Sequence, residues 1–289
     1  MRILITGAAG FLARPLQQHL RQEHHELHGV DCRPVPLAIP HECNLGSPEA
    51  VADLVRSLRP DRVFHLAGTF ANEFNADFAG NVATTQNLLE AICTHAPAAR
   101  VLLIGSAAEY GWVQPEDNPV EENHRLAPVS VYGWSKVCQT HLAQFYHRVR
   151  GVDVVLARLF NLSGKGASRR LFVGRMEEQI ALLKQGQTRE IVAGNLDSIR
   201  DYVPVEKAAR LLVEIARCGL AGEVYHVGSG VPVKMRDMLE RMLAEAGIGF
   251  ERVRVENRRP DAKLDIPMIF ADMRRTAALL PAEVGILPA

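Results

Sequence analysis

The fold is decided by the first stretch of the chain, MRILITGAAGFLARPLQQHLRQEHHELHGVD, which covers residues 1–31. Residues 2–6 form a short apolar run rich in Ile and Leu, which is typical of a strand buried on both faces. A turn with Gly7 and Gly10 follows, then a helical spacing of apolar residues, then a second apolar strand over residues 25–30 that leads into an aspartate. This order of strand, glycine turn, helix, strand and acid is typical of a unit that binds a dinucleotide.

Each residue of this unit has a physical task. Gly7 permits the tight turn, and Gly10 leaves space for a pyrophosphate over the N-terminus of the helix. Ala13 stands in place of a third glycine and still allows the helix to pack closely on the strand. Asp31 lies about twenty residues after the turn, where a carboxylate can bind ribose hydroxyls. The alternative is a tight turn without a ligand, and the strand, helix and acid around the glycines argue against it.

Length and composition exclude several classes of protein. The 289 residues can bury a core as one large domain or as two small ones. Lys plus Arg and Asp plus Glu each number 33, so no bulk charge favours a nucleic acid or an acidic membrane as partner. Five cysteines without regular spacing predict reduced thiols and a cytoplasmic protein. No apolar run reaches the ~18 residues of a membrane span, and the glycine turn interrupts the N-terminal apolar run too early for a signal peptide.

Three histidines, His24, His25 and His28, lie before and within the second predicted strand. They have no cysteine nearby, so we predict a solvated turn there and no metal site.

After the first unit, predicted strands and helices alternate. The predicted helices cover residues 48–59, 81–94 and 131–150, and the predicted strands cover residues 62–66, 101–104 and 153–159. Such alternation requires a parallel sheet with helices on both faces. We therefore predict an α/β fold of the Rossmann type, with a doubly wound parallel sheet.

The pattern changes after residue 161. Helices are predicted over residues 173–185, 205–218 and 235–246, strands over 224–227 and 252–255, and a turn within 191–201. We expect a nucleotide-binding Rossmann domain over residues 1–161 and a smaller C-terminal substrate domain over residues 162–190 and 229–289. Residues 191–228 are expected to return partly to the large sheet.

Three side chains suit hydride transfer at a carbonyl carbon. Tyr132 and Lys136 are four residues apart on a predicted helix, so they share a face, and Ser106 sits just past a predicted strand. Tyrosine has a pKa of about 10 and is a poor acid–base group at neutral pH. A nearby ammonium favours the phenolate, so we expect Lys136 to lower the pKa of Tyr132. The alternative is an ordinary Tyr and Lys on a helix, and their position after a nucleotide-binding unit argues against it.

These features resemble a known family, the extended short-chain dehydrogenase/reductases, in the NAD-dependent epimerase/dehydratase group that acts on nucleotide sugars. The motifs that carry the resemblance are TGAAGF at 6–11, HLAG at 65–68, NVATTQNLLEA at 81–91, Ser106 with Tyr110-Gly111, YGWSK at 132–136 and RLFN at 158–161. Two further segments, GNLDSIRDY at 194–202 and RRPD at 258–261, are similar to the branch that handles GDP-linked 6-deoxyhexoses.

The resemblance implies a catalytic triad of Ser106, Tyr132 and Lys136. The residues predicted to bind the cofactor are Gly7, Ala9, Gly10, Phe11, Leu12, Asp31, Arg33, Asn44, Leu45, Leu66, Ala67, Gly68, Asn81, Tyr132 and Lys136. The residues predicted to bind the substrate are Thr69, Phe70, Ser106, Ala107, Asn161, Arg200 and Arg259. We favour NAD(H) over NADP(H), because Asp31 should repel a 2′-phosphate, although Arg33 close by offsets this. The resemblance also implies a homodimer, paired through the helices over residues 81–94 and 131–150.

One departure from the family decides between reactions. The family's dehydratases carry acidic residues directly after the catalytic Ser or Thr, where they supply the acid and base that eliminate water. Here Ala107 and Ala108 occupy those positions, and alanine cannot transfer protons. Glu109 is one step further along and is expected to point elsewhere. A second departure is Asn44, which stands where relatives often carry Asp near the adenine.

We therefore predict NAD(P)H-dependent reduction of the 4-keto group of a nucleotide-linked 4-keto-6-deoxyhexose, GDP-linked by the resemblance. One alternative is a nucleotide-sugar 4-epimerase that keeps its NAD bound. The other is a non-catalytic dinucleotide-binding protein, against which the complete triad argues.

Overall fold

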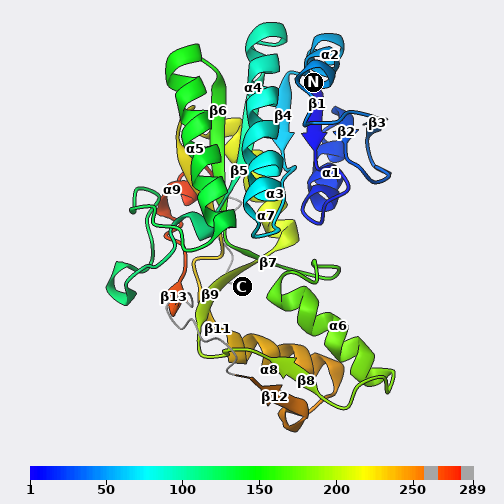
Figure 1. The fold of residues 1–289 in the computed structure, drawn as a ribbon, viewed down its shortest axis with the longest axis vertical. Helices are drawn as coiled ribbons and strands as arrows, with labels where there is room; N and C mark the ends of the chain where they lie inside the picture. The colour runs from blue at the N-terminus through cyan, green and yellow to red at the C-terminus, as the bar shows by residue number, and fades with distance from the viewer. Residues whose placement is uncertain (257–265, 281–289) are drawn as a thin grey trace.

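The computed structural model describes residues 1–256 and 266–280 (Figure 1). Its larger lobe is built on a seven-stranded parallel sheet with the order β10-β6-β5-β4-β1-β2-β3. The strands are β1 (Arg2–Thr6), β2 (Glu26–Val30), β3 (Ile39–His41), β4 (Arg62–His65), β5 (Arg100–Ser106), β6 (Asp153–Leu159) and β10 (Val224–Val227). The chain runs from β1 outward to β3 on one side and from β4 outward on the other, which confirms the predicted doubly wound α/β fold. Open α/β sheets bind ligands where this order reverses, outside the carboxyl ends of the strands, and here that point lies between β1 and β4.

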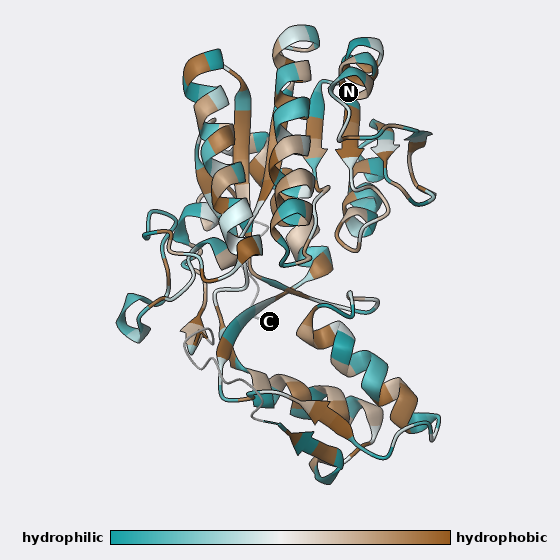
Figure 2. Ribbon diagram, in the orientation of Figure 1, coloured by the Kyte–Doolittle hydropathy of each residue, from teal (hydrophilic) through white to brown (hydrophobic). Residues whose placement is uncertain are grey.

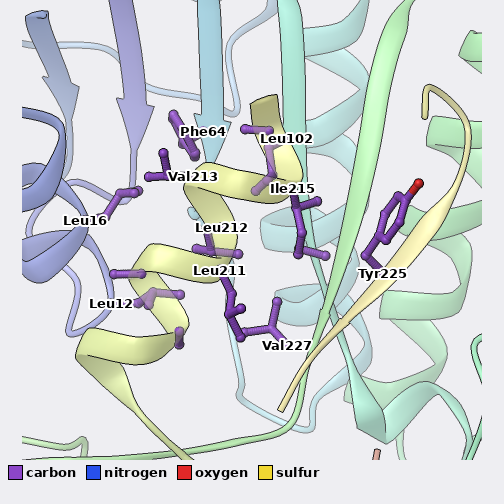
Figure 3. Packing of buried hydrophobic residues seen from close by; sticks show 14 of the residues in the cluster. Leu12, Leu16, Phe64, Leu102, Leu211, Leu212, Val213, Ile215, Tyr225 and Val227 are labelled. Carbon is purple, nitrogen blue, oxygen red and sulfur yellow. The ribbon is translucent and has the colours of Figure 1, made fainter. Parts of the chain in front are cut away.

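Side chains alternate along the central strands and build a core on each face of the sheet. Ile3 and Ile5 pack in one core while Leu4 between them packs in the other, as the two-residue period of a strand requires. Helices α1 (Ala13–Gln22) and α7 (Val205–Cys218) cover the first face. Helices α2 (Pro48–Leu58), α4 (Thr84–His95) and α5 (Val131–Arg150) cover the second. Figure 3 shows α7 lying over the strands that carry Phe64 and Leu102.

A smaller lobe lies beyond the carboxyl ends of these strands (Figure 1). In it, β9 pairs with β7, β11 and β13, and β8 pairs separately with β12. The elements are β7 (Asn161–Ser163), α6 (Phe172–Lys184), β8 (Ile191–Ala193), β9 (Ile199–Pro204), β11 (Pro232–Lys234), α8 (Met235–Ala246), β12 (Val253–Val255) and β13 (Met268–Ile269). Helices α6 and α8 enclose a separate apolar core with Met176, Ile180, Leu239 and Leu243, and Figure 2 shows hydrophobic residues on both helices.

Short helical segments complete the described chain. They are α3 (Phe74–Asp77), the π-helix η1 (Phe78–Ala83), the 3₁₀ turns η2 (Ala107–Glu109), η3 (Pro115–Asp117) and η4 (Phe250–Arg252), and α9 (Arg274–Ala277). Over residues 1–256 and 266–280, no helix combines the length and the apolar character that crossing a membrane requires.

The structure departs from the predicted elements in four places. The helix predicted over residues 81–94 begins earlier, as η1, and becomes α4 at Thr84. The turn predicted within residues 191–201 contains β8 and the start of β9. Ser106 is the last residue of β5 and does not follow it. Strands β3, β7, β11 and β13 have only two or three residues each, too few to show a two-residue period in the sequence.

The segment over residues 191–228 is shared between the lobes. Strands β8 and β9 lie in the smaller lobe, whereas α7 packs on the large sheet and β10 pairs with β6 at its edge. These pairings support the proposed division of the chain near residue 161, which stays a prediction.

Candidate active site

The glycine turn lies where the strand order of the large sheet reverses. Gly7 has a φ of +68°, and a Cβ there would lie 2.7 Å from the backbone nitrogen of Ala67, which follows β4. A Cβ at Gly10 would lie 2.9 Å from the carbonyl oxygen of Gly7. Phe11 and Leu12 complete the turn, and no side chain caps the N-terminus of α1 at Leu12. A turn with glycine at its two closest approaches, against an uncapped helix N-terminus, fits the pyrophosphate of a dinucleotide.

Asp31 follows β2 and joins it to the glycine turn. Its Oδ2 accepts a hydrogen bond from the backbone nitrogen of Ala9 at 3.0 Å, and its Oδ1 accepts from the backbone nitrogen of Arg33 at 3.0 Å. Burial raises the pKa of Asp31, but these bonds and the Arg33 guanidinium more than offset it, so the pKa lies below its usual value. Asp31 is therefore a carboxylate at neutral pH, the state in which it accepts hydrogen bonds from ribose hydroxyls.

The other predicted cofactor residues follow β3 and β4. Asn44 Oδ1 accepts from the backbone nitrogen of Gly46 at 3.0 Å, so it stabilises its own turn, and the Leu45 carbonyl accepts from Asn87 at 2.9 Å. Leu66, Ala67 and Gly68 directly follow β4. A Cβ at Gly68 would lie 3.6 Å from Lys136 Nζ, so the end of β4 lies beside the lysine.

Asn81 lies directly beside this region, since a Cβ at Gly68 would be 2.6 Å from its Oδ1. Its side chain is fully buried in η1. Oδ1 accepts from the backbone nitrogen of Thr69 at 2.9 Å, while Nδ2 donates to the Thr69 carbonyl at 3.0 Å and to Ser135 Oγ at 2.9 Å. Both N–H groups of the amide are therefore used within the protein. Asn81 thus holds the loop after β4, and its contact with the cofactor stays a prediction.

The three residues of the predicted triad lie around the end of β5. Ser106 ends the strand. Helix α5 starts after Ser130 because Ser130 Oγ accepts a backbone N–H of the first turn and so caps the helix. Tyr132 and Lys136 lie one turn apart on α5. The Ser106 side chain hydrogen-bonds Tyr132, and Lys136 Nζ donates to the Ile104 carbonyl of β5 at 3.1 Å.

The pKa of Tyr132 differs from the sequence-based expectation. Burial raises it to about 12, and the hydrogen bond from Ser106 lowers it only in part, while the charges of Glu109 and Asp77 raise it. The expected net lowering of this pKa is not found, because burial dominates. Burial also lowers the pKa of Lys136 to about 8, against the opposing charges of Glu109 and Asp77. Tyr132 is thus a protonated phenol at neutral pH.

A short loop after β4 reaches over the tyrosine. The ring of Phe70 meets the ring of Tyr132 edge-on, with centroids 4.7 Å apart. Backbone N–H groups of Ala71 and Asn72 donate to the two carboxylate oxygens of Asp77, each at 2.8 Å, and Thr69 is held by Asn81 as described. The structure therefore brings Phe70 to Tyr132, and the contact of Thr69 and Phe70 with a substrate stays a prediction.

The remaining predicted substrate residues lie at different places. Ala107 begins η2, directly after Ser106. Asn161 and Arg200 lie on neighbouring strands between the lobes, and Asn161 Nδ2 donates to the Asp201 carbonyl at 3.2 Å. The structure places them beyond the end of the large sheet, and their contact with a substrate stays a prediction. Arg259 lies outside the described residues.

A buried ion pair that no sequence-based prediction included lies beneath the triad. Glu109 and Arg158 are almost fully buried, and Glu109 Oε2 accepts from Arg158 Nη2 at 2.8 Å. Glu109 Oε1 accepts from the backbone nitrogen of Ser106 at 2.7 Å, and Oε2 also accepts from Thr140 Oγ1 at 2.9 Å. Glu109 therefore joins the catalytic strand to the helix of Tyr132 and Lys136. The Ser-x-x-Glu pattern at 106–109 is a capping box, and it could have predicted the contact of Glu109 with Ser106 but not the pairing with Arg158.

A second missed contact crosses between the lobes. Arg170, just before α6, donates from Nη1 to the Phe70 carbonyl at 2.9 Å. No local pattern in the sequence signals this contact, because the two residues are far apart in the chain.

Among the three histidines considered for a metal site, His28 hydrogen-bonds the ring of His41 at 2.9 Å. Over residues 1–256 and 266–280, no three side chains of His, Cys, Asp or Glu converge on a common point for a metal ion.

Comparison with known proteins gives a consistent result. The family described as NAD dependent epimerase/dehydratase family matches residues 3–228. A GDP-6-deoxy-D-mannose reductase of Pseudomonas aeruginosa is 31% identical over 87% of this chain and 82% of its own. A GDP-6-deoxy-D-talose 4-dehydrogenase of Aggregatibacter actinomycetemcomitans is 30% identical over 80% of this chain and 75% of its own.

Among solved structures, RMD from Pseudomonas aeruginosa complexed with NADPH superimposes with a TM-score of 0.83 at 28% identity, covering 96% of this chain and 91% of that one. The family model over residues 3–228 and the relative at 31% identity show that the chain belongs to the NAD-dependent epimerase/dehydratase family.

Proposed function

We propose that the protein reduces the 4-keto group of a GDP-linked 4-keto-6-deoxyhexose. The observation that carries the proposal is the arrangement of Ser106, Tyr132 and Lys136 around the end of β5, with alanine at 107 and 108. The reductase from Pseudomonas aeruginosa, similar over most of both chains, supports the GDP-linked 6-deoxyhexose as substrate class.

The chain's own residues would handle the proton. A nicotinamide cofactor, when bound, would supply the hydride to the carbonyl carbon. Ser106 hydrogen-bonds the carbonyl oxygen, and the Tyr132 hydroxyl donates its proton as the oxygen gains charge. Lys136 stabilises the phenolate that remains. A pKa of about 12 keeps Tyr132 protonated until the oxygen becomes basic, which suits reduction.

The 4-epimerase alternative needs Tyr132 to act first as a base and then as an acid. The raised pKa of Tyr132 opposes the first step. Tight, stoichiometric NAD in the isolated protein would favour the epimerase, whereas a protein isolated without NAD would favour the reductase.

We expect the protein to reduce a preformed 4-keto sugar and to be unable to make one. Elimination of water needs two positioned proton carriers, and losing one typically costs ~10²–10⁴ in rate. Ala107 and Ala108 replace both, and Glu109 is bound to Arg158. The test compares GDP-mannose alone with GDP-mannose plus a separate dehydratase, each with NADH or NADPH. We expect coenzyme oxidation only in the second mixture, and formation of the 4-keto sugar by this protein alone would contradict the proposal.

We expect a preference for NADH over NADPH. The Asp31 carboxylate is ionised and would repel a 2′-phosphate, and the Arg33 guanidinium is held 3.3 Å from Asp31 Oδ1. Because that ion pair occupies Arg33, a phosphate would have to compete with Asp31 for it. Kinetics with both coenzymes measure the preference, and a higher kcat/KM with NADPH would show the opposite. The solved structure of RMD holds NADPH, so this test also shows whether the two proteins differ in coenzyme preference.

We propose a homodimer that pairs through α4 and α5. Exposed Phe145 and Val149 extend along α5, and near its start the ring of Trp134 lies 5.7 Å from that of Phe74. An exposed apolar face of this kind is typical of an interface. Light scattering should show a dimer, and Phe145→Glu should shift it toward the monomer. Leu220→Glu is the control, because Leu220 is also exposed but precedes β10. A wild-type monomer at micromolar concentration would contradict the dimer.

A cytoplasmic location is also proposed. Its support is that all five cysteines are free thiols, which is typical of a reducing compartment. Fractionation of the producing cells would test it.

A further inference from the structure

A buried glutamine holds the lysine of the triad. Lys136 Nζ donates to Gln139 Oε1 at 2.8 Å and to the Ile104 carbonyl at 3.1 Å. An ammonium has three donors and no acceptor, so the nearest amide atom of Gln139 must be its oxygen. Two of the three N–H groups are thus used within the protein, and one remains for the cofactor and Tyr132. Both side chains are buried, Lys136 at 5% and Gln139 at 1% exposure.

Gln139 is itself fixed from its other end. Its Nε2 donates to Thr85 Oγ1 at 2.7 Å, and Thr85 Oγ1 donates its own proton to the Asn81 carbonyl at 2.7 Å. Because the Thr85 hydroxyl already donates its single proton to Asn81, it can only accept a hydrogen bond from Gln139. The amide therefore cannot turn over without losing a bond at both ends, and its carbonyl stays directed at Lys136.

The network continues to the glycine turn. His65 hydrogen-bonds Thr85 through Nε2 at 3.1 Å and Thr6 through Nδ1 at 2.7 Å. Burial and, to a smaller extent, the charge of Lys136 lower the pKa of His65 to about 3. The imidazole is thus uncharged, and a continuous, fully buried polar chain runs from Lys136 to the residue that precedes Gly7.

We propose that Gln139 is a positioning residue, whose side-chain carbonyl fixes the Lys136 ammonium beside Tyr132 and keeps it charged in spite of its burial. A buried ammonium is costly unless dipoles or charges compensate it. Here the Gln139 side-chain carbonyl compensates the ammonium by a direct hydrogen bond. The inference rests on the proposed function only in giving Lys136 a role in reduction.

The other charged and titratable groups that face Lys136 come from several elements. Asp77 of α3 and Glu109 of η2 favour its charge, Glu109 is paired with Arg158 of β6, and His65 of β4 is neutral. None of them is altered in the variants below, so a change in the titration of Lys136 reports on residue 139.

The test uses two substitutions with opposite expected effects. Gln139→Met keeps much of the volume and removes the carbonyl, whereas Gln139→Glu keeps the shape and adds a negative charge. The lysine ammonium can be titrated directly by ¹³Cε NMR, because the chain has only six lysines and Lys136→Met assigns the resonance. This measurement needs neither substrate nor cofactor.

We expect the Lys136 resonance to titrate near pH 8 in the wild type, in line with its pKa of about 8. The midpoint should fall by about one pH unit in Gln139→Met and rise by about as much in Gln139→Glu. Reduction needs the charged lysine, so the alkaline limb of the kcat profile should move the same way in each variant. The control is Gln179→Met, which removes bonds to the backbone of Val192 in the smaller lobe and should leave the midpoint unchanged.

A midpoint that stays put in both Gln139 variants would overturn the proposal, and a loss of rate or stability without a shift would show a structural role only. Should the Met variant not fold, the rise expected in Gln139→Glu still decides the question. If the NMR midpoints move as expected but no 4-keto sugar is reduced, the proposed function fails and the role of Gln139 stands.

Discussion

Tyr132→Phe should reduce kcat for the 4-keto sugar by ~10²–10⁴-fold, the usual loss when a positioned proton donor is removed. The Phe70 ring that meets Tyr132 edge-on can pack on phenylalanine as well, so the fold should survive. Coenzyme binding should be largely unchanged, because the substitution leaves the glycine turn and Asp31 intact. Stopped-flow or steady-state coenzyme oxidation measures the rate, and coenzyme fluorescence measures the binding.

The matched control is Tyr146→Phe, which removes a tyrosine hydroxyl from the same helix. Tyr146 donates to Glu90 of α4, on the side of α5 that faces its neighbouring helix. Its loss should leave kcat near the wild-type value. If Tyr132→Phe keeps most of its rate while the fold is intact, another group protonates the substrate and the proposed role of Tyr132 is wrong.

The second large effect is expected from Arg158→Met. Arg158 donates to Glu109, to Tyr110 Oη at 2.8 Å and to the Glu122 carbonyl at 3.2 Å, and its side chain is 2% exposed. Removing it leaves the Glu109 carboxylate buried without its partner charge. Breaking a buried pair in this way typically lowers the free energy of unfolding by ~3–5 kcal/mol. Urea denaturation measures the loss, and activity should fall as well because Glu109 binds the backbone of Ser106.

A double variant that removes both charges of the pair tests whether the unpaired charge causes the loss of stability. Arg158→Met with Glu109→Gln leaves no unpaired charge, so the double variant should recover much of the lost stability. The exposed pair of Arg56 and Asp53 provides the control, and Arg56→Met should change stability little, because solvent screens such a pair. Equal losses in the single and the double variant would mean that packing and not charge dominates at Arg158.

Local patterns predicted most of the large lobe. The whole dinucleotide-binding unit lies within the first 31 residues, and its strand, turn and helix depend on neighbours in the chain. Helices α5, α7 and α8 have the predicted bounds. For α5 the reason is local, since Ser130 caps its start and Gly151, with φ +70°, ends it. The four-residue spacing of Tyr132 and Lys136 also placed them on one face without any knowledge of the fold.

Contacts between distant residues were decided by the tertiary structure. Glu109 and Arg158 are 49 residues apart, and Phe70 and Arg170 are 100 apart, so no helical or strand period connects them. The short strands β7 and β13 form only because β9 offers backbone groups to pair with. The pKa of Tyr132 was also decided by the tertiary structure. Residue types alone predicted a lowered pKa, but folding buries the phenol. Desolvation and the charges of Glu109 and Asp77 together outweigh the hydrogen bond from Ser106, so the pKa is raised.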